Sequence, residues 1–188
     1  MPVITCVLID GYSEQTKRLL ETRLSDAARS ATGAPWDGIT VMINELPGEN
    51  YMRGRVGRIP AIAPEQPAAL VRRFLDAMQA RDLDAAKSCL SDEYMMTFPG
   101  GVEFSELEQL IEWAKPRYQS ISKSYERFDE AFDDQGAVVY CSGTLSGQWP
   151  DGTAFDGIRF IDSFRITDAK LVEQRVWNDL AEQRSTAG

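Results

Sequence analysis

MPVITCVLIDG, residues 1–11, places a proline directly after the initiator methionine and continues into β-branched residues. Such a run predicts a strand that starts beside Pro2. If Met1 is removed, Pro2 becomes a secondary amine whose ring fixes the direction of the lone pair. A free α-amino group has a pKa near ~8 in water, and an apolar site lowers that value toward neutrality, where a general base works best. The alternative is that Pro2 only promotes trimming of the methionine.

The residues after this strand complete a βαβ unit. A helical run over 17–32 is followed by Gly33-Ala34-Pro35 and a second strand over 39–45. The two strands are expected to pair in parallel through a right-handed crossover. About 55 residues of this kind cannot close a core alone, so we expect oligomerisation. The helix carries an apolar stripe at three- and four-residue spacing, formed by Leu19, Leu20, Leu24, Ala27, Ala28 and Ala31.

The first 55 residues carry four short features that occur together. These are Pro2, the segment GYSEQ at 11–15, the turn Ala34-Pro35 and the segment NELPGENY at 44–51. In this combination the unit resembles the 4-oxalocrotonate tautomerase family. The resemblance implies that Pro2 shuttles protons in keto–enol or double-bond isomerisation, or adds to an activated carbonyl or alkene. It also implies assembly as hexamers or pseudo-hexameric trimers.

Two positions depart from that family's pattern. Members that bind dicarboxylates have an arginine just after the first-strand glycine and another in the second strand, where this chain has Tyr12 and Thr40. The aromatic residue that lines the family's pocket is kept as Tyr51. We therefore expect a neutral carbonyl compound or a monoacid as substrate. Tyr12 either donates a hydrogen bond to the substrate carbonyl or covers a neighbouring subunit.

Composition excludes several classes of function. The chain of 188 residues contains no histidine, so an imidazole-dependent triad is excluded and the usual metal ligand is missing. Proton transfer by Pro2 needs no metal or organic cofactor, and we expect none. Residues 1–60 carry seven charges of each sign, so the formal charge of −9 belongs to 61–188, and an acidic surface disfavours nucleic acid. No apolar run suits a membrane span, and the three cysteines are widely spaced. We expect a soluble, cytoplasmic protein.

After residue 56 the pattern changes. A Pro-rich linker over 57–67 leads into a larger second domain over 68–182, and a flexible tail is expected over 183–188. Helices come first and antiparallel strands follow, so the whole chain is of the α+β class. The segments expected are helices from 68, from 82 and over 105–113, an extended piece over 94–98, and strands over 120–132, 137–148, 153–166 and 171–178.

The second domain resembles the SnoaL-like and ketosteroid-isomerase-like superfamily, with its nuclear transport factor 2-like fold, over about 66–182. The segments that carry the resemblance are 74–82, FIDSFRI at 160–166 and EQRVWND at 173–179. It implies a cone-shaped pocket between a curved sheet and the helices, and a possible dimer. Because the superfamily includes isomerases, cyclases, hydrolases and binding modules, the fold alone does not give the function.

Strand alternation points to candidate residues inside this cone. Asp162 shares a face with Phe160 and Phe164, and Asp179 shares one with Trp177. A carboxyl group in an aromatic pocket can act as base or acid on a carbonyl compound. In the alternative reading the aromatics are ordinary core, Asp162 pairs with Arg159 or Arg175, and Asp179 caps its strand. The remaining pocket aromatics are expected to be Tyr94, Phe98 and Trp113.

Three hypotheses about function follow. In the first, Pro2 is the base of a tautomerase acting on a small carbonyl compound, Tyr51 and Thr40 contact substrate, and Tyr12 or backbone amides steady the enolate oxygen. In the second, Asp162 or Asp179 performs isomerisation or aldol cyclisation, with the βαβ unit as a scaffold. In the third, the cone domain binds a small molecule without turnover.

Overall fold

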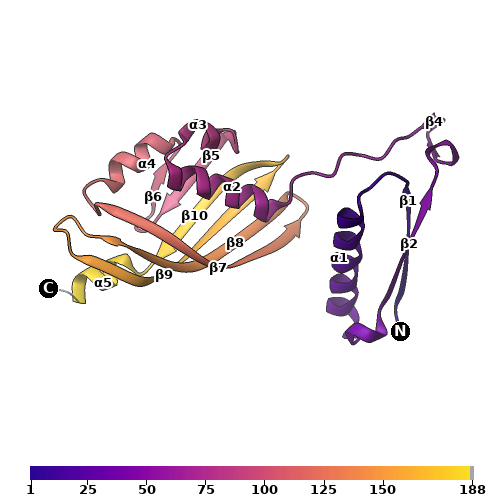
Figure 1. Cartoon of the computed structure of the whole chain (residues 1–188), viewed down its shortest axis with the longest axis horizontal. Coiled ribbons are helices and arrows are strands. Elements are labelled where there is room, and N and C mark those ends of the chain that lie inside the picture. Colours follow the sequence, from indigo (N-terminus) through magenta and orange to yellow (C-terminus); the bar gives the residue numbers. More distant parts are fainter. Residues whose placement is uncertain (187–188) are drawn as a thin grey trace. The chain divides into compact units, whose positions relative to one another are not determined.

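The computed structural model describes residues 1–186 (Figure 1), and the side chains of 1–183. The chain divides into two compact units, Met1–Pro64 and the residues from Glu65 on. The boundary between them lies within the Pro-rich segment 57–67. No helix among the described residues is both long and apolar enough to cross a membrane.

The first unit is a βαβ element followed by a small hairpin. Strands β1, Val3–Ile9, and β2, Thr40–Leu46, pair in parallel, with Val3 opposite Thr40 and Ile9 opposite Leu46. Helix α1, Glu14–Thr32, begins where the Ser13 hydroxyl accepts from the Thr16 backbone N–H at 3.1 Å and ends at Gly33, whose φ of 69° is left-handed. The hairpin strands are β3, Met52–Arg53, and β4, Val56–Gly57.

This unit buries very little of itself. Helix α1 contains no buried residue, and Ile9 and Gly38 are the buried residues of the described first unit. Strand β1 alternates, so Ile4, Cys6 and Leu8 are half-buried while Val3 and Val7 are more than half exposed. Met42 on β2 is exposed as well. One face of the two-stranded sheet thus leaves Val3, Val7 and Met42 open to solvent, next to the exposed polar residues Thr5, Thr40 and Asn44.

The second unit packs helices on a curved six-stranded sheet (Figure 1). The strand order is β6-β5-β10-β9-β8-β7; β5 runs parallel to β10 and all other neighbours are antiparallel. The helices are α2, Pro67–Ala80, α3, Leu83–Lys87, α4, Leu107–Ala114, and α5, Leu180–Thr186. The strands are β5, Leu90–Phe98, β6, Val102–Phe104, β7, Ser120–Asp133, β8, Gly136–Gln148, β9, Ala154–Thr167, and β10, Lys170–Asn178.

The α+β class and the order of the expected helices and strands are confirmed. The structure adds the hairpin β3–β4, strand β6 and helix α5, which the sequence did not indicate. One difference lies at the carboxyl end, where α5 continues to Thr186 through most of the tail expected from 183. Residues 187 and 188 of that tail lie outside the described residues.

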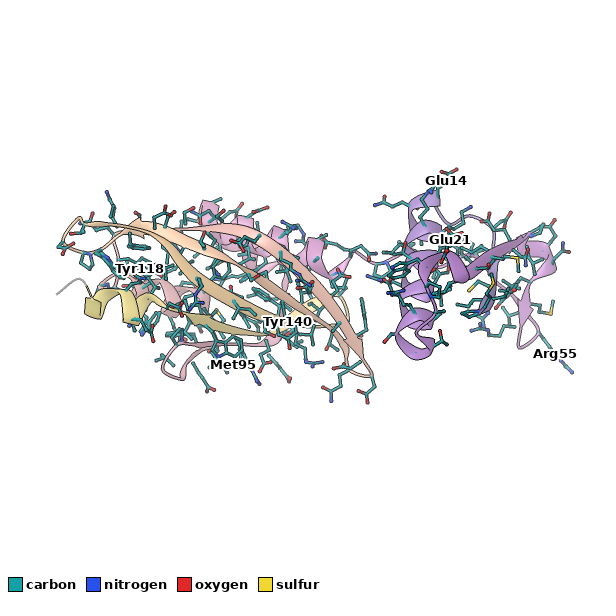
Figure 2. All side chains as sticks on the ribbon, turned by 90° about the horizontal axis from the view of Figure 1, so that it is seen from below. Glu14, Glu21, Arg55, Met95, Tyr118 and Tyr140 are labelled. Atoms are coloured by element: carbon teal, nitrogen blue, oxygen red, sulfur yellow. The ribbon has the colours of Figure 1, made fainter. Side chains whose placement is uncertain are left out.

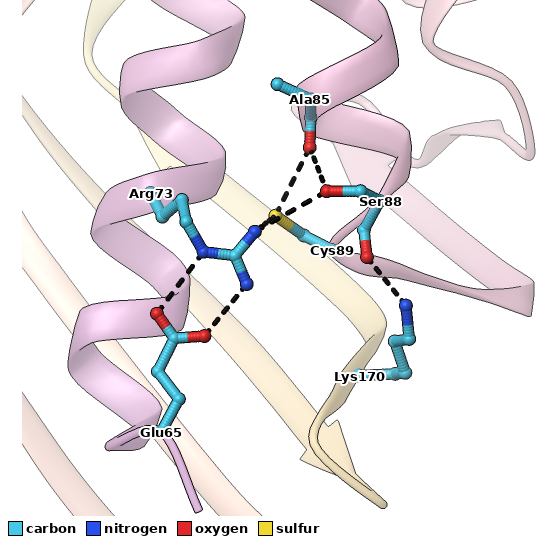
Figure 3. Close-up of polar contacts among 6 residues, drawn as sticks. All are labelled: Glu65, Arg73, Ala85, Ser88, Cys89 and Lys170. Atoms are coloured by element: carbon cyan, nitrogen blue, oxygen red, sulfur yellow. Dashed lines mark hydrogen bonds and ion pairs between the residues drawn. The ribbon is translucent and has the colours of Figure 1, made fainter.

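Polar contacts fix the first helices of the second unit to the sheet (Figure 3). The Arg73 guanidinium donates to both carboxylate oxygens of Glu65, at 3.2 and 2.8 Å, and to the Cys89 sulfur at 3.0 Å. The hydrogen bonds from Arg73 and its positive charge lower the pKa of the Glu65 carboxyl. Lys170 at the start of β10 donates to the backbone oxygen of Ser88 at 2.6 Å. The contacts join α2, the end of α3 and β10.

The core of the second unit lies between α2 and the sheet. Phe74 on α2 meets Tyr94 and Phe164 edge-on, with ring centroids 6.0 Å apart in each case. Phe164 is fully buried at the centre of this group. Its ring therefore occupies space that no neighbouring side chain can fill.

We expect Phe164→Ala to lower the free energy of unfolding by about 3–5 kcal/mol, because the substitution leaves a cavity in a close-packed core. Urea unfolding followed by tryptophan fluorescence measures this change. The matched control is Phe132→Ala, whose side chain is 54% exposed, and which should cost about 0.5 kcal/mol. Equal losses in the two variants would contradict this placement of the core.

Candidate functional site

A cavity of about 340 Å³ opens between the concave face of the sheet and helices α2 and α4. Its wall combines aromatic and aliphatic side chains with a few polar groups. The residues that line it include Phe74, Leu75, Met78, Arg81, Phe98, Leu110, Trp113, Arg117, Tyr118, Ser120, Ile121, Lys123, Tyr125, Leu145, Phe160, Gln174, Val176, Asn178 and Leu180.

A fully buried carboxylate lies behind the cavity wall. Asp162 Oδ2 accepts from Lys123 Nζ and from Gln174 Nε2, the latter at 3.2 Å. The Gln174 Oε1 atom in turn accepts from the Tyr94 hydroxyl at 2.9 Å. Asp162 Oδ1 is buried without a hydrogen-bond partner among the described residues. Lys123 and Gln174 stand on the wall itself and connect the carboxylate to the cavity.

Two tyrosine hydroxyls and one thiol near this carboxylate have raised pKa values. Burial raises the pKa of Tyr94 well above its ordinary value, and the negative charge of Asp162 adds to the rise. Burial and the same charge raise the pKa of Tyr125. Burial likewise raises the pKa of the Cys141 thiol to about 12. At neutral pH the two tyrosines and the thiol therefore stay neutral. Beside them, Asp162 and Lys123 form an ion pair of which Lys123 lines the cavity.

The amine of Lys123 lies between an apolar and a charged neighbour. Its nitrogen lies 4.5 Å from the centroid of the Phe160 ring, and its side chain is 21% exposed. On β8, the position paired with both Tyr125 and Phe160 is Gly143, which has no side chain to separate them. The amine thus has one contact with a buried anion and access to the cavity.

The structure confirms the expected inward face of β9 but not that of β10. Phe160, Phe98 and Trp113 line the cavity, whereas Phe164 and Tyr94 are buried in the core behind it. The predictions for Trp177 and Asp179 were wrong. Trp177 is 49% exposed beside Ile161, which is also exposed.

A β-bulge accounts for the error. The register of β10 shifts between Leu171 and Glu173, so Gln174 and Val176 face the cavity instead of their odd-numbered neighbours. Asp179, which follows the end of β10, forms an ion pair with Arg159 at 2.7 Å. The partner of Asp162 is Lys123 and neither of the two arginines expected in the alternative reading.

Sequence reasoning missed Lys123, Tyr125 and Gln174. For the first two a signal existed, since Ile121, Lys123 and Tyr125 alternate along the strand predicted over 120–132 and share one face. A lysine between two inward apolar positions indicates a buried cation that needs an anion. For Gln174 there was no signal, because the bulge reverses the expected face.

In the first unit Pro2 and Thr40 lie side by side at one end of the sheet. The Thr40 backbone N–H donates to the Pro2 oxygen at 3.1 Å, and Pro2 is half-buried. Beside them is an open depression lined by Met1, Ala34, Pro35, Asp37 and Gly38. While Met1 is attached, the Pro2 nitrogen is an amide and has no basicity.

Tyr12 and Tyr51 lie at the other end of the same sheet. Both follow the carboxyl ends of the parallel strands, and the seven residues of β1 span about 23 Å at ~3.3 Å per residue. The Tyr12 hydroxyl accepts from the Ala61 backbone N–H at 3.2 Å, and Arg53 donates to the Tyr51 hydroxyl at 3.1 Å. One copy of the chain therefore does not bring Pro2 together with either tyrosine.

Comparison with known proteins identifies both units. Residues 2–57 match the family described as tautomerase enzyme, and residues 71–174 match the family described as SnoaL-like domain. The chain belongs to both families.

Two relatives of the tautomerase unit illustrate the likeness. A probable tautomerase of Bacillus cereus is 33% identical over 54 residues, which cover 29% of this chain and 88% of that protein. The 2-hydroxymuconate tautomerase of Pseudomonas putida is 37% identical over 51 residues, 27% of this chain and 81% of that protein.

The SnoaL-like unit has solved relatives in fold. An NTF2-like protein of unknown function from Burkholderia pseudomallei superposes with a TM-score of 0.54 at 17% identity, covering 62% of this chain and 92% of its own. At this identity the likeness shows the fold alone. The two family memberships together support isomerase, tautomerase or cyclase activity.

We expect Lys123→Met to lower the free energy of unfolding by about 3 kcal/mol, because it leaves a buried carboxylate without its counter-charge. The double variant Lys123→Met/Asp162→Asn should recover most of this loss, since no buried charge remains. Urea unfolding of the wild type and the variants measures both values. If the loss in free energy of unfolding in the double variant equals the sum of the losses in Lys123→Met and Asp162→Asn, the pairing is contradicted.

Proposed function

We propose that the tautomerase unit catalyses proton transfer in a small carbonyl compound, with the Pro2 nitrogen as general base. The observation that carries this proposal is the family match that begins at residue 2, together with the position of Pro2 at a strand end beside an open depression. The amine removes a proton from the enol oxygen of the substrate. The resulting pyrrolidinium ion returns that proton to carbon, so no proton is gained or lost overall.

The proposal includes assembly of several copies through this unit, as a trimer or hexamer. Pro2 and the two tyrosines lie at opposite ends of one sheet, so a pocket that contains all three needs a neighbouring copy. The exposed apolar sheet face of Val3, Val7 and Met42 offers the surface for it. The outer face of the six-stranded sheet, where Ile161 and Trp177 are exposed, offers a surface for a further pairing of two copies.

We expect the mass of the intact purified protein to lack methionine, because the proposed base requires a free Pro2 amine. With that form, Pro2→Ala should reduce enol-to-keto turnover of a phenylpyruvate-type enol by ~10²–10⁴-fold. Absorbance of the enol follows the rate. The control Asp162→Asn changes only the other unit and should keep wild-type turnover.

Retention of the methionine in an active enzyme, or full activity of Pro2→Ala, would exclude Pro2 as the base. Loss of turnover in Asp162→Asn with wild-type turnover in Pro2→Ala would place the chemistry in the second unit instead.

We expect Val7→Glu and Met42→Glu to break the assembly into smaller species, since each places a charge in the middle of an apolar contact. Light scattering coupled to size-exclusion chromatography measures the mass. The control Ile62→Glu lies at a side chain that is 96% exposed outside the sheet and should leave the mass unchanged. An unchanged mass in both sheet variants would show that this face is not an interface.

A second candidate function belongs to the cavity of the SnoaL-like unit. It is favoured by the buried pair of Asp162 and Lys123, of which only the lysine reaches the cavity wall. In this function the Asp162 carboxylate holds Lys123 in place and balances its positive charge. The Lys123 amine donates a hydrogen bond to the oxygen of a bound carbonyl compound during isomerisation or cyclisation. Asp179 has no part in it, because its partner Arg159 lies outside the cavity. Binding without turnover is the third possibility for the same cavity.

A further inference from the structure

The charges on the cavity wall are all of one sign. Arg81, Arg117 and Lys123 line it, and no Asp or Glu does so among the residues that the structure describes. The chain as a whole has a formal charge of −9, so this wall is opposite in sign to the rest of the protein. Neither Arg81 nor Arg117 forms an ion pair with a described carboxylate, and their charges are available to a ligand.

Packing fixes the position of Arg117. Its guanidinium carbon lies 4.1 Å from the centroid of the Trp113 ring, and the residue is half-buried. A guanidinium stacked on an aromatic ring keeps its N–H donors free at the edge of the plane. The stacked arginine can therefore present two parallel donors to a carboxylate in the cavity.

Arg81 reaches the same region from a strained backbone position. It ends α2 with φ of 61°, a left-handed conformation in which glycine is the usual residue. Arg81, Arg117 and Tyr118 all line the cavity. The positive charges of both arginines oppose the rise in the pKa of Tyr118 that burial causes. Tyr118 lies at the end of the unit where α5 begins (Figure 2). Two positive charges thus converge on one end of the cavity.

The remainder of the cavity suits a different part of a ligand. Lys123 lies three residues into β7, about 10 Å along the strand from Ser120. The rings of Phe98, Trp113 and Phe160 line the same cavity, with Trp113 stacked against Arg117 and Phe160 beside the amine of Lys123. A matching ligand has a carboxylate at one end, a flat apolar body, and a polar oxygen at the other.

We propose that this cavity binds the anion of an aromatic monocarboxylic acid, with its carboxylate on Arg81 and Arg117 and a hydroxyl or carbonyl oxygen toward Lys123. The inference rests on the second candidate function, because it names the ligand class of the same cavity. It concerns binding, so it can be tested separately from turnover.

Isothermal titration calorimetry of the full chain provides the test, with 6-hydroxy-2-naphthoate and the neutral 6-hydroxy-2-naphthamide as probes. The carboxylate should bind ~10- to 100-fold more tightly than the amide, as expected for charge-assisted hydrogen bonds. Arg81→Gly and Arg117→Gln should each weaken carboxylate binding about tenfold and leave amide binding unchanged. Arg81→Gly should keep or raise the melting temperature, because glycine suits the positive φ.

The matched control is Arg127→Gln. This residue is also on β7, but its side chain is 72% exposed, pairs with Asp129 and does not line the cavity. Arg127→Gln removes one positive charge, as each cavity variant does, and should leave the affinities for the carboxylate and the amide probe unchanged. Asp162→Asn separates this proposal from the second candidate function, because it keeps both arginines. A retained carboxylate preference supports the binding proposal, and unchanged isomerisation or cyclisation by the second unit in the same variant would remove only the catalytic role.

Four results would overturn the proposal. They are equal affinity for the two probes, no detectable binding of the carboxylate probe, a carboxylate preference that survives in Arg81→Gly/Arg117→Gln, and a loss in Arg127→Gln as large as in the cavity variants.

Discussion

The second unit depends on how it accommodates the buried carboxylate of Asp162. A charge removed from water costs several kcal/mol unless partners replace its hydration. The residues that do so come from different strands: Lys123 from β7, Gln174 from β10 and, through Gln174, Tyr94 from β5. Together with β9 they involve four of the six strands, so these contacts form only when the sheet has this strand order and register. The same requirement places an amine on the cavity wall.

Much of this unit was predictable from local pattern. Period-two alternation over 153–166 correctly placed Phe160 and Asp162 on the inward face, because side chains of a regular strand alternate without exception. The helical stripe that includes Phe74 and Leu75 likewise indicated a buried helix face. Such patterns report what each element does on its own, and those parts of the fold were confirmed.

The cavity required information that no single segment holds. The bulge after Leu171 adds one residue to β10 and exchanges its faces, and nothing in that strand's composition marks it. The pairing of Lys123 with Asp162 joins strands that are not neighbours in the sheet, since β8 lies between them. Residues 39 positions apart meet only after the register of two strand pairs is set. Sequence reasoning therefore found the anion and missed its cation.

The two units place their candidate reactive groups in different surroundings. The SnoaL-like unit has a core of its own, and its Asp162–Lys123 ion pair and its cavity are formed by one copy of the chain. The tautomerase unit buries almost nothing and separates Pro2 from Tyr12 and Tyr51 by the length of a strand. In the proposed assembly, a neighbouring copy against the open sheet face would supply both the missing burial and the missing part of the site. Tyr12 and Thr40 stand where dicarboxylate-binding relatives have arginines, and the cavity of the second unit carries two arginines without carboxylate partners. The proposed site of the first unit thus lacks cations for a second carboxylate, and the ligand proposed for the second unit places its single carboxylate on both arginines. One monocarboxylic acid would therefore suit both proposals.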